Sequence, residues 1–507
     1  MIRKWIRRVL ALAKGVANPT MPSENVKEMK FQRHQLHSMS DENVRAFAKK
    51  HELPYLNEFL QSVALAQQGF QERKVRNFQL DLITRGCFDV TCPFTGNVLT
   101  TGSSLLLNDK STVFGFVGSS SLMVCIGDLS QGYPICGAIF PGLRIVTTLV
   151  ASDWGFLDRH LDEMLEVQRK CGWLPGPAGR SLKIVTGDSN FAHHAWNQLS
   201  AFQELAERGQ SPALELIVTQ EPFGPIREIF PEIDFSEVAY VPDIGLHGLN
   251  HGGELLAPIG AIFIQAALVD RLMQVAERRA SAACQEMSAG LDRCQGPVLW
   301  ISVRSRNRTP TNQVALLASL AEAFLRAAEN AMIIIDGFSV SDDFERSPSY
   351  HQNAARGIVS EDIAVAEQVK EKIGHELSQR MLVAIGLSIS DTILLARHAD
   401  LYFCHHGSVQ HKIGWFTSAP GMVHANLAVL ESYPAIWVSQ QSEVATKPTY
   451  IPSSLLRGTE ELSGNVSELN HLLHHENYEL NAEGTVQLFM AFAREIGVVP
   501  SASGAQA

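Results

Sequence analysis

The chain has 507 residues, of which 45% are hydrophobic and 19% are charged, and its net charge is −11. This length is sufficient for two or three domains, and this composition excludes a wholly disordered chain. The negative charge argues against nucleic-acid binding as the main function. The 8 cysteines form no CxxC pair, which favours a cytoplasmic protein with reduced thiols.

The amino terminus predicts a basic amphipathic helix. Residues 1–14 carry five basic residues and no acidic one, and Trp5 is an aromatic anchor on the apolar side. This pattern is typical of a peripheral contact with an anionic membrane surface, and packing on the protein itself is the alternative. No uninterrupted apolar stretch of about 20 residues occurs, so no membrane span is predicted. We therefore expect a cytoplasmic protein, with residues 1–14 as the candidate contact to the inner face of the membrane.

The next part of the chain predicts a helical and polar segment to residue 79 and a β-rich segment with a linker at 80–180. Short apolar runs separated by Gly, Ser or Asn-Asp are typical of hairpins. They lie at Val98–Leu107, Thr112–Val117, Leu122–Ile126 and Arg144–Leu149. A helix is expected at Trp154–Lys170, and Pro175-Gly176-Pro177 marks the linker.

From residue 181 onward, predicted strands alternate with predicted helices in two consecutive blocks. The first block, 181–295, has strands at Leu182–Thr186, Leu214–Thr219 and Val238–Val241 and helices at Ala195–Arg208 and Ile262–Arg279. The second block, 296–507, has strands at Val298–Val303, Met332–Ile335, Met381–Ile385, Leu401–Cys404 and Ala435–Val438 and helices at Thr311–Glu329, Glu361–Gln379 and Ser390–His398. This alternation predicts an α/β protein with two facing, doubly wound, Rossmann-like domains and a β-rich amino-terminal addition.

Polar groups follow two strands of the second block. The sequence RSRNR occupies residues 304–308 after one strand, and HHGS occupies residues 405–408 after the other. Guanidinium groups offer paired donors that stay charged, and a helix that starts at Ser408 favours anions at its amino terminus. Ligands of open α/β sheets bind at such strand ends. We therefore expect a site for a diphosphate-bearing ligand, with Arg306 turned toward solvent.

A different pattern follows the first strand of the first block. The sequence GDSN at residues 187–190 is similar to the nucleophile block of SGNH-type hydrolases, with Ser189 as the attacking hydroxyl. Such an enzyme also needs an imidazole, normally from a DxxH motif, and the chain contains no DxxH. An esterase or deacetylase that uses Ser189 is therefore one alternative function. A non-catalytic glycan- or nucleotide-binding protein is another.

Three motifs, taken together and in order, resemble glycosyltransferase family 61. They are NFAH at 190–193, then ISVR at 301–304 with Arg308 and Asn312-Gln313, then the segment from Ile389 to HGS at 406–408. The resemblance spans about Thr186 to Gly421. The chain departs from the family pattern at three places: Gln313 and Asn197 stand where acids are usual, and VQHK at 409–412 replaces the stretch with an expected asparagine.

This resemblance implies a GT-B fold and the transfer of a hexosyl or pentosyl unit from a nucleotide-sugar donor to a hydroxyl of a glycan or glycoconjugate. The expected role is the synthesis of a surface polysaccharide or another glycoconjugate. No metal or other cofactor is expected, and Asp342-Asp343 are interpreted as a solvated loop. The implied donor-binding residues are Arg304, Arg308, Asn312, His406, Gly407 and Ser408. The best candidate for the catalytic base is His193, and Asp188 and Asp243 are the next candidates.

Overall fold

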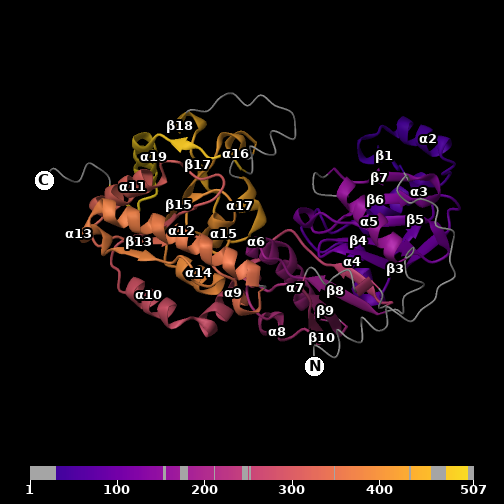
Figure 1. The fold of residues 1–507 in the computed structure, drawn as a ribbon, viewed down its shortest axis with the longest axis horizontal. Helices are drawn as coiled ribbons and strands as arrows, with labels where there is room; N and C mark the ends of the chain where they lie inside the picture. The colour runs from indigo at the N-terminus through magenta and orange to yellow at the C-terminus, as the bar shows by residue number, and fades with distance from the viewer. Residues whose placement is uncertain are drawn as a thin grey trace.

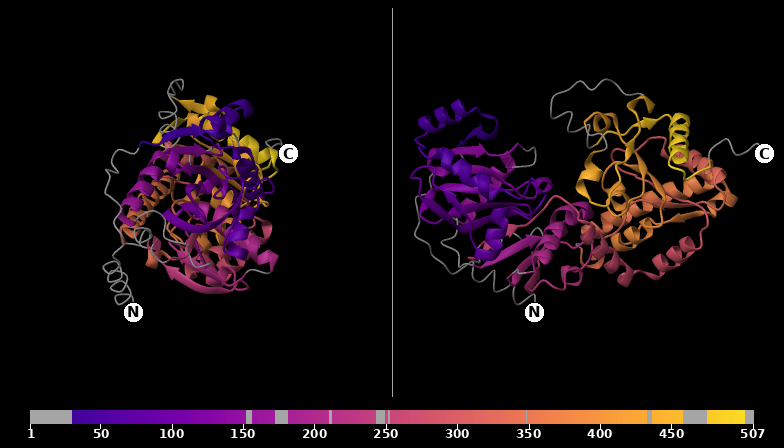
Figure 2. Two further views of the ribbon diagram at one scale, coloured as in Figure 1. Left: turned by 90° about the vertical axis from the view of Figure 1, so that its right-hand side faces the viewer. Right: turned by 180° about the vertical axis from the view of Figure 1, so that it is seen from behind.

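The computed structural model describes residues 30–151, 156–171, 181–209, 212–242, 249–250, 253–347, 349–432, 436–457 and 475–500. The predicted amphipathic helix at 1–14, the linker at 175–177 and Asp243 lie outside these ranges. Three units lie in a row, and the smaller α/β unit stands between the β-rich unit and the larger α/β unit (Figures 1 and 2). Within the described ranges, no helix has both the length and the apolar character that a membrane crossing requires.

The β-rich unit is a sheet with the strand order β1-β7-β6-β5-β4-β3-β2. Its strands are β1 (Gln32–Gln35), β2 (Asp89–Thr91), β3 (Val98–Asn108), β4 (Ser111–Phe116), β5 (Ser119–Ile126), β6 (Ile135–Phe140) and β7 (Ile145–Thr148). One face packs on α2 (Asp41–Lys50), α3 (Leu56–Ala66) and α4 (Asn77–Arg85). The opposite face packs on Phe156 and on α5 (Asp158–Cys171). Successive side chains of a strand point to opposite faces of the sheet, and both faces are covered, so Val113 and Phe114 belong to different cores.

The smaller α/β unit has a parallel sheet with the order β10-β9-β8-β11. Its elements are β8 (Leu182–Thr186), α6 (Phe191–His193), a π-helix (His194–Leu199), α7 (Ser200–Arg208), β9 (Leu214–Val218), α8 (Ile226–Ile229), β10 (Phe235–Tyr240) and β11 (Leu255–Pro258). Helices cover one face of this sheet. Leu106 of β3 packs on the other face, against Val185, Ile217 and Leu256. Because a parallel sheet requires cover on both faces, the β-rich unit stands where a second helix layer is usual.

The larger α/β unit has a parallel sheet with the order β14-β13-β12-β15-β16-β17. Its strands are β12 (Val298–Ser302), β13 (Met332–Asp336), β14 (Met381–Val383), β15 (Leu401–His405), β16 (Gly421–His424) and β17 (Thr449–Tyr450). One core joins a face of the sheet to α11 (Gln313–Ala327), α12 (Ser349–Ile373) and α19 (Ala482–Glu495). The other face packs on α9 (Ala266–Arg279), α10 (Ala282–Asp292) and α14 (Ile389–Ala396). This second core continues into the smaller unit, so the two parallel sheets share it.

Short elements complete this unit and include one correction. They are α13 (His375–Ser378), α15 (Ser408–Gly414), α16 (Leu427–Ser432), α17 (Ile436–Gln441), β18 (Leu456–Arg457) and β19 (Glu479–Leu480). The strand predicted at Ala435–Val438 is wrong, since Ile436–Gln441 is helical. An apolar run of four residues has too few positions to reveal a period of 2 or 3.6. The fifth and sixth strands are β16 and β17, and the predicted fold class with two Rossmann-like domains is confirmed.

Candidate functional site

The ends of β12 and β15 meet at the point where the strand order reverses. The chain passes from β12 to β13 and β14 on one side, and β15 then pairs with β12 on the other. Gly407 follows β15 with φ +115°, and a Cβ atom built on it would lie 3.5 Å from Nη2 of Arg308 and 4.0 Å from Nη1 of Arg304. The topology therefore brings both guanidinium groups against the backbone of Gly407, at the usual ligand position of such a sheet.

Neither arginine is neutralised by the protein. Arg304 and Arg308 are half-buried, and within the described residues neither forms an ion pair with a carboxylate. Burial, together with the charge of Arg308, lowers the pKa of Arg304 to about 10, while Tyr478 and Asp362 oppose the shift. Burial also lowers the pKa of Arg308. Guanidinium groups nevertheless stay charged at neutral pH, so the site holds two adjacent cations without a paired carboxylate and favours an anionic ligand.

Gln313 fixes the loop that carries the arginines. Its Oε1 accepts a hydrogen bond of 2.9 Å from the backbone N–H of Arg304, and its Nε2 donates one of 2.9 Å to the backbone carbonyl of the same residue. A carboxylate at this position would accept the first bond but would have no proton to donate for the second. The neutral amide therefore holds the backbone without adding a negative charge beside Arg304.

Asn312 bonds to the backbone of β19, whereas His406 lies beside the two arginines. The side-chain amide of Asn312 donates to Leu480 O at 2.6 Å and accepts from Leu480 N at 3.3 Å, so it holds β19 in place. His406 lies beside the arginines and its Nδ1 is 2.7 Å from the hydroxyl of Tyr450. Burial lowers the pKa of His406 to about 3, with Arg308 and Arg304 adding to the effect. Its imidazole is thus neutral at physiological pH.

A cavity of about 340 Å³ lies between the two α/β units, next to the start of α15. The smaller unit contributes loops after β8 and β9, and the larger unit contributes the loop after β13, one side of α12 and the beginning of α15. Its polar lining consists of Ser189, Asn190, Gln220, Ser339, Ser341, Ser347, His351, Ser408 and Lys412, and Phe191, Phe338 and Phe344 contribute aromatic surface. The cavity shares Ser408 with the predicted donor site, so it adjoins the arginine pair.

Lys412 connects two walls of this cavity. Its buried ammonium donates to Asp336 Oδ1 at 2.6 Å, to Gly337 O at 2.5 Å and to the Ser339 hydroxyl at 2.9 Å. Each of the three N–H donors of the ammonium thus bonds to one acceptor, and these bonds connect α15 to the loop after β13. Burial raises the pKa of Asp336 to about 6, although the charge of Lys412 opposes this shift.

The predicted catalytic residues of the smaller unit do not form a dyad of His193 and Asp188. Asp188 is buried, accepts from Asn190 N at 2.7 Å and forms a 3.0 Å ion pair with Lys110 of the β-rich unit. Nδ1 of His193 instead lies 3.2 Å from Oδ1 of Asn197. His193 is close enough to the buried His411 of α15 for its charge to lower the pKa of that residue, after burial and His406. The side chain of His193 is half-buried.

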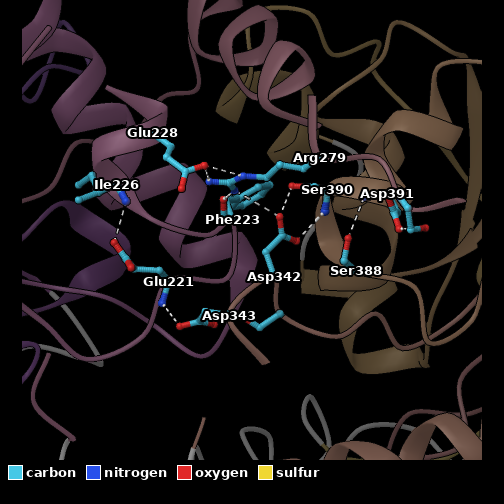
Figure 3. A network of polar contacts seen from close by, with 12 residues as sticks. Glu221, Phe223, Ile226, Glu228, Arg279, Asp342, Asp343, Ser388, Ser390 and Asp391 are labelled. Atoms are coloured by element: carbon cyan, nitrogen blue, oxygen red, sulfur yellow. Dashed lines mark hydrogen bonds and ion pairs between the residues drawn. The ribbon is translucent and has the colours of Figure 1, made fainter. Parts of the chain in front are cut away.

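A polar network fixes the two α/β units to each other (Figure 3). Arg279, at the end of α9, pairs with Glu228 at 2.5 Å, donates to Phe223 O at 2.7 Å and lies 3.6 Å from Asp342. Asp342 also accepts hydrogen bonds from the backbone N–H and the hydroxyl of Ser390. This network joins loops that border the cavity on both sides, so it defines their relative position.

The interpretation of Asp342-Asp343 as a solvated loop is therefore wrong. The side chain of Asp342 is 8% exposed, and Asp343 is buried and accepts from Glu221 N at 2.9 Å. Burial raises the pKa of Asp342 and of Glu221. Ser390, a partner of Asp342, lies 48 positions away, and Glu221, the partner of Asp343, lies 122 positions away, so no local pattern indicated these contacts. Within the described ranges, no group of three or more His, Cys, Asp or Glu residues is arranged to hold a metal ion.

Comparisons with known proteins give weak structural likenesses. No protein-family model and no curated protein sequence matches the chain. The crystal structure of a glycosyl transferase of family 9 from Veillonella parvula is 11% identical, with a TM-score of 0.36 over 62% of this chain and 96% of that one. A UDP-forming α,α-trehalose-phosphate synthase from Burkholderia xenovorans, in complex with glucose-6-phosphate, is 11% identical, with a TM-score of 0.23 over 60% and 68%. The structure of TarM is 10% identical, with a TM-score of 0.21 over 95% and 91%.

Glycosyltransferases are thus among the solved structures that this chain resembles. The TM-scores of these three structures are below 0.5, and likenesses of this strength carry no information on function. The assignment to two Rossmann-like domains rests instead on the two parallel sheets and on the reversal of strand order between β12 and β15.

Proposed function

We propose that the chain is a glycosyltransferase that moves a hexosyl or pentosyl unit from a nucleotide-sugar donor to a hydroxyl of a glycan or glycoconjugate. The observation that carries this proposal is the pair Arg304 and Arg308, which lack a carboxylate partner within the described residues and lie against Gly407 at the reversal of strand order. Two fixed cations match the two phosphates of a nucleoside diphosphate. The ordered motifs that resemble family 61 support the same assignment.

The chemistry follows from where charge develops. As the bond from the sugar to the diphosphate breaks, its electron pair goes to the departing phosphate oxygen, which becomes more negative. Arg304 and Arg308, with the backbone amides of Gly407 and Ser408, stabilise this charge without a metal ion. His193 takes the proton from the acceptor hydroxyl. The cavity that shares Ser408 provides the space for the sugar.

A donor screen tests the proposal directly. The protein is incubated with UDP, GDP, dTDP and CMP and with their sugar derivatives, and the melting temperature is measured. A ligand at about 100 times its Kd stabilises the native state by about 2.7 kcal/mol, so at least one donor is expected to raise the melting temperature by several degrees. The same donor should release its nucleotide when acceptors are supplied. If no nucleotide or donor binds, the proposal fails, and if one binds without any turnover, the non-catalytic alternative replaces it.

The hydrolase alternative makes a different prediction for Ser189. This side chain is exposed and lines the cavity, and within the described residues no histidine forms a hydrogen bond with its hydroxyl. We expect Ser189→Ala to keep at least about half of the transfer rate, because a hydroxyl without a base is not an activated nucleophile. A fluorophosphonate probe should leave the wild-type protein unlabelled. Labelling that disappears in Ser189→Ala would instead establish a serine hydrolase.

A further inference from the structure

The orientation of the Asn197 side chain is determined by its partners. Asn197 is fully buried, its Nδ2 donates to Ala261 O at 2.9 Å, and its own backbone carbonyl accepts from Ala261 N at 2.8 Å. Only the amide nitrogen is able to donate to a carbonyl, which assigns the two ends of the side chain. Oδ1 therefore faces the opposite way, toward Nδ1 of His193 at 3.2 Å.

This orientation determines the tautomer of His193. Oδ1 of Asn197 only accepts hydrogen bonds, so the ring nitrogen that faces it must carry the proton. A neutral imidazole with its proton on Nδ1 has a free lone pair on Nε2. Within the described part of the chain, no group forms a hydrogen bond with Nε2, and the side chain is half-buried. His193 thus presents an unprotonated nitrogen outward from the smaller unit.

The local backbone explains why Asn197 is available for this contact. Residues His194–Leu199 form a π-helix, and the backbone carbonyl of Asn197 accepts from the loop after β11. Nε1 of Trp196 donates to Ile262 O at 2.6 Å and secures the same loop. Single π-helical turns of this kind occur frequently at functional sites. Here the turn is held by Ala261 and Ile262, His193 directly precedes it, and Asn197 lies within it.

We propose that Asn197 is a positioning residue, which holds His193 with its proton on Nδ1 so that Nε2 serves as the base of sugar transfer. This inference rests on the proposed function. In the step, Nε2 takes the proton of the acceptor hydroxyl while the acceptor oxygen bonds to the anomeric carbon and the diphosphate departs with the electron pair. An aspartate would also fix the tautomer, but its charge would stabilise the imidazolium, whereas the neutral amide does not.

The charged and titratable neighbours of His193 are defined. His411 of α15 lies near His193. The pKa of His411 is lowered mainly by burial, then by the charge of His406, and then by the charge of His193. Asp188 of the preceding loop is paired with Lys110. Within the described residues, no carboxylate forms a hydrogen bond or an ion pair with the ring of His193. Replacing the amide of Asn197 by a carboxylate would therefore place an anion in direct contact with the imidazole.

The tautomer is measured without any assumption about activity. In protein labelled with ¹⁵N-histidine, long-range ¹H–¹⁵N correlation spectra distinguish Nδ1–H from Nε2–H, and the signal of His193 is the one that His193→Gln removes. We expect Nδ1–H for His193 in the wild-type protein. Nε2–H in the wild type would overturn the inference, whatever the outcome of the donor screen. Absence of transfer with every donor would overturn the proposed function but would leave the measured tautomer standing.

Two variants then separate positioning from structural support. Asn197→Ala is expected to lower kcat by about 10- to 100-fold with little change in the donor KM, because the base loses its orientation. Asn197→Asp retains an acceptor, so it should keep the Nδ1–H tautomer, recover part of kcat and move the acidic limb of the pH–rate profile upward. Melting temperatures are measured for both. Equal losses of kcat in the two variants, in proportion to their melting temperatures and with an unmoved pH profile, would refute a positioning role.

Discussion

Arg304→Ala is expected to lower the affinity for nucleoside diphosphate by about 100- to 1000-fold, which corresponds to about 3–4 kcal/mol. The reason is that Gln313 fixes the backbone of Arg304 and that Nε of Arg304 donates to Asn307 O at 2.7 Å, which orients the guanidinium. The guanidinium has no carboxylate partner in the described residues, so its Nη donors are available to phosphate. Loss of one cation also leaves Arg308 alone to face two phosphates. Isothermal titration calorimetry with the nucleotide identified in the donor screen measures the effect.

The neighbouring Arg306 gives a matched control. Its side chain is exposed and lies two positions away in the same loop, so Arg306→Ala removes the same charge at nearly the same place in the sequence. We expect its affinity to stay within about threefold of the wild type, since exposed charges contribute little across a screened solvent. Equal losses in the two variants would mean that general charge, rather than the arginine pair at Gly407, binds the nucleotide.

Arg304→Ala is also expected to have a distinctive effect on the thermal stability of the protein. Arg304 is desolvated and lies beside another cation, which lowers its pKa, so its positive charge is unfavourable in the unliganded protein. Arg304→Ala should therefore leave the unliganded melting temperature unchanged or slightly raised, while the nucleotide no longer raises it. A residue that only supports the fold would show the opposite pattern, with a lower melting temperature and retained binding. Loss of function with a gain in stability is typical of binding residues.

The arginine and glycine loops were predictable from the sequence for a specific physical reason. Buried parallel strands appear as continuous apolar runs, so β12 and β15 were visible at Val298–Val303 and Leu401–Cys404. The polar residues that follow such runs lie at one edge of a sheet, whichever order the strands take. The strand order then decided which ends meet, and the pairing of Leu299 with Leu401 places the two loops together.

Other parts of the site had no local signal. Lys412 follows HGSVQH in a short helix and has the pattern of an ordinary surface lysine, yet its ammonium is buried against Asp336, which is 76 positions earlier. The partners of Asp342 and Asp343 likewise come from distant loops. Asn312 was assigned to the donor by a motif, whereas its amide bonds to Leu480. Each of these contacts depends on tertiary packing, which sequence periodicity does not encode.

The β-rich unit illustrates the same limit at the level of the fold. Its hairpins were visible in the sequence, but its position against the smaller sheet was not. Leu106 packs on that sheet, and Asn250 accepts from Leu106 N at 2.7 Å and donates to Leu106 O at 2.9 Å. A strand residue on an antiparallel sheet has the same alternating pattern whether it faces a helix, a second sheet or solvent-excluded loops. Only the three-dimensional structure shows that Leu106 packs on the open face of the smaller parallel sheet.

Lys412→Met is expected to lower the free energy of unfolding by about 3–5 kcal/mol at pH 8. Methionine preserves most of the side-chain volume, so the effect comes from the ammonium. Its removal leaves the carboxylate of Asp336, which is fully buried, without its 2.6 Å partner, and deprives Gly337 O and the Ser339 hydroxyl of a donor. Because these groups form the junction of α15 with the loop after β13, the change also loosens two walls of the cavity.

The pH dependence of this loss has a definite sign. Burial raises the pKa of Asp336 to about 6 in the folded protein, above its value in the unfolded chain. The folded state therefore binds more protons than the unfolded state between these two values, and stability from this group increases as pH falls through 6. Without Lys412 the pKa rises further, since the opposing charge is gone. Protonation then removes the buried charge, and the deficit of the variant should shrink toward about 1 kcal/mol at pH 5.

Urea unfolding at pH 8 and pH 5, followed by tryptophan fluorescence, measures both values. Lys370→Met is the control, because its ammonium pairs with Glu367 at 3.4 Å on the exposed side of α12 and should contribute less than about 1 kcal/mol at either pH. The double variant Lys412→Met with Asp336→Asn removes the orphaned charge and should recover part of the loss at pH 8. A deficit that stays the same at both pH values, or that the double variant enlarges, would show that packing rather than the buried ion pair holds α15 to the sheet.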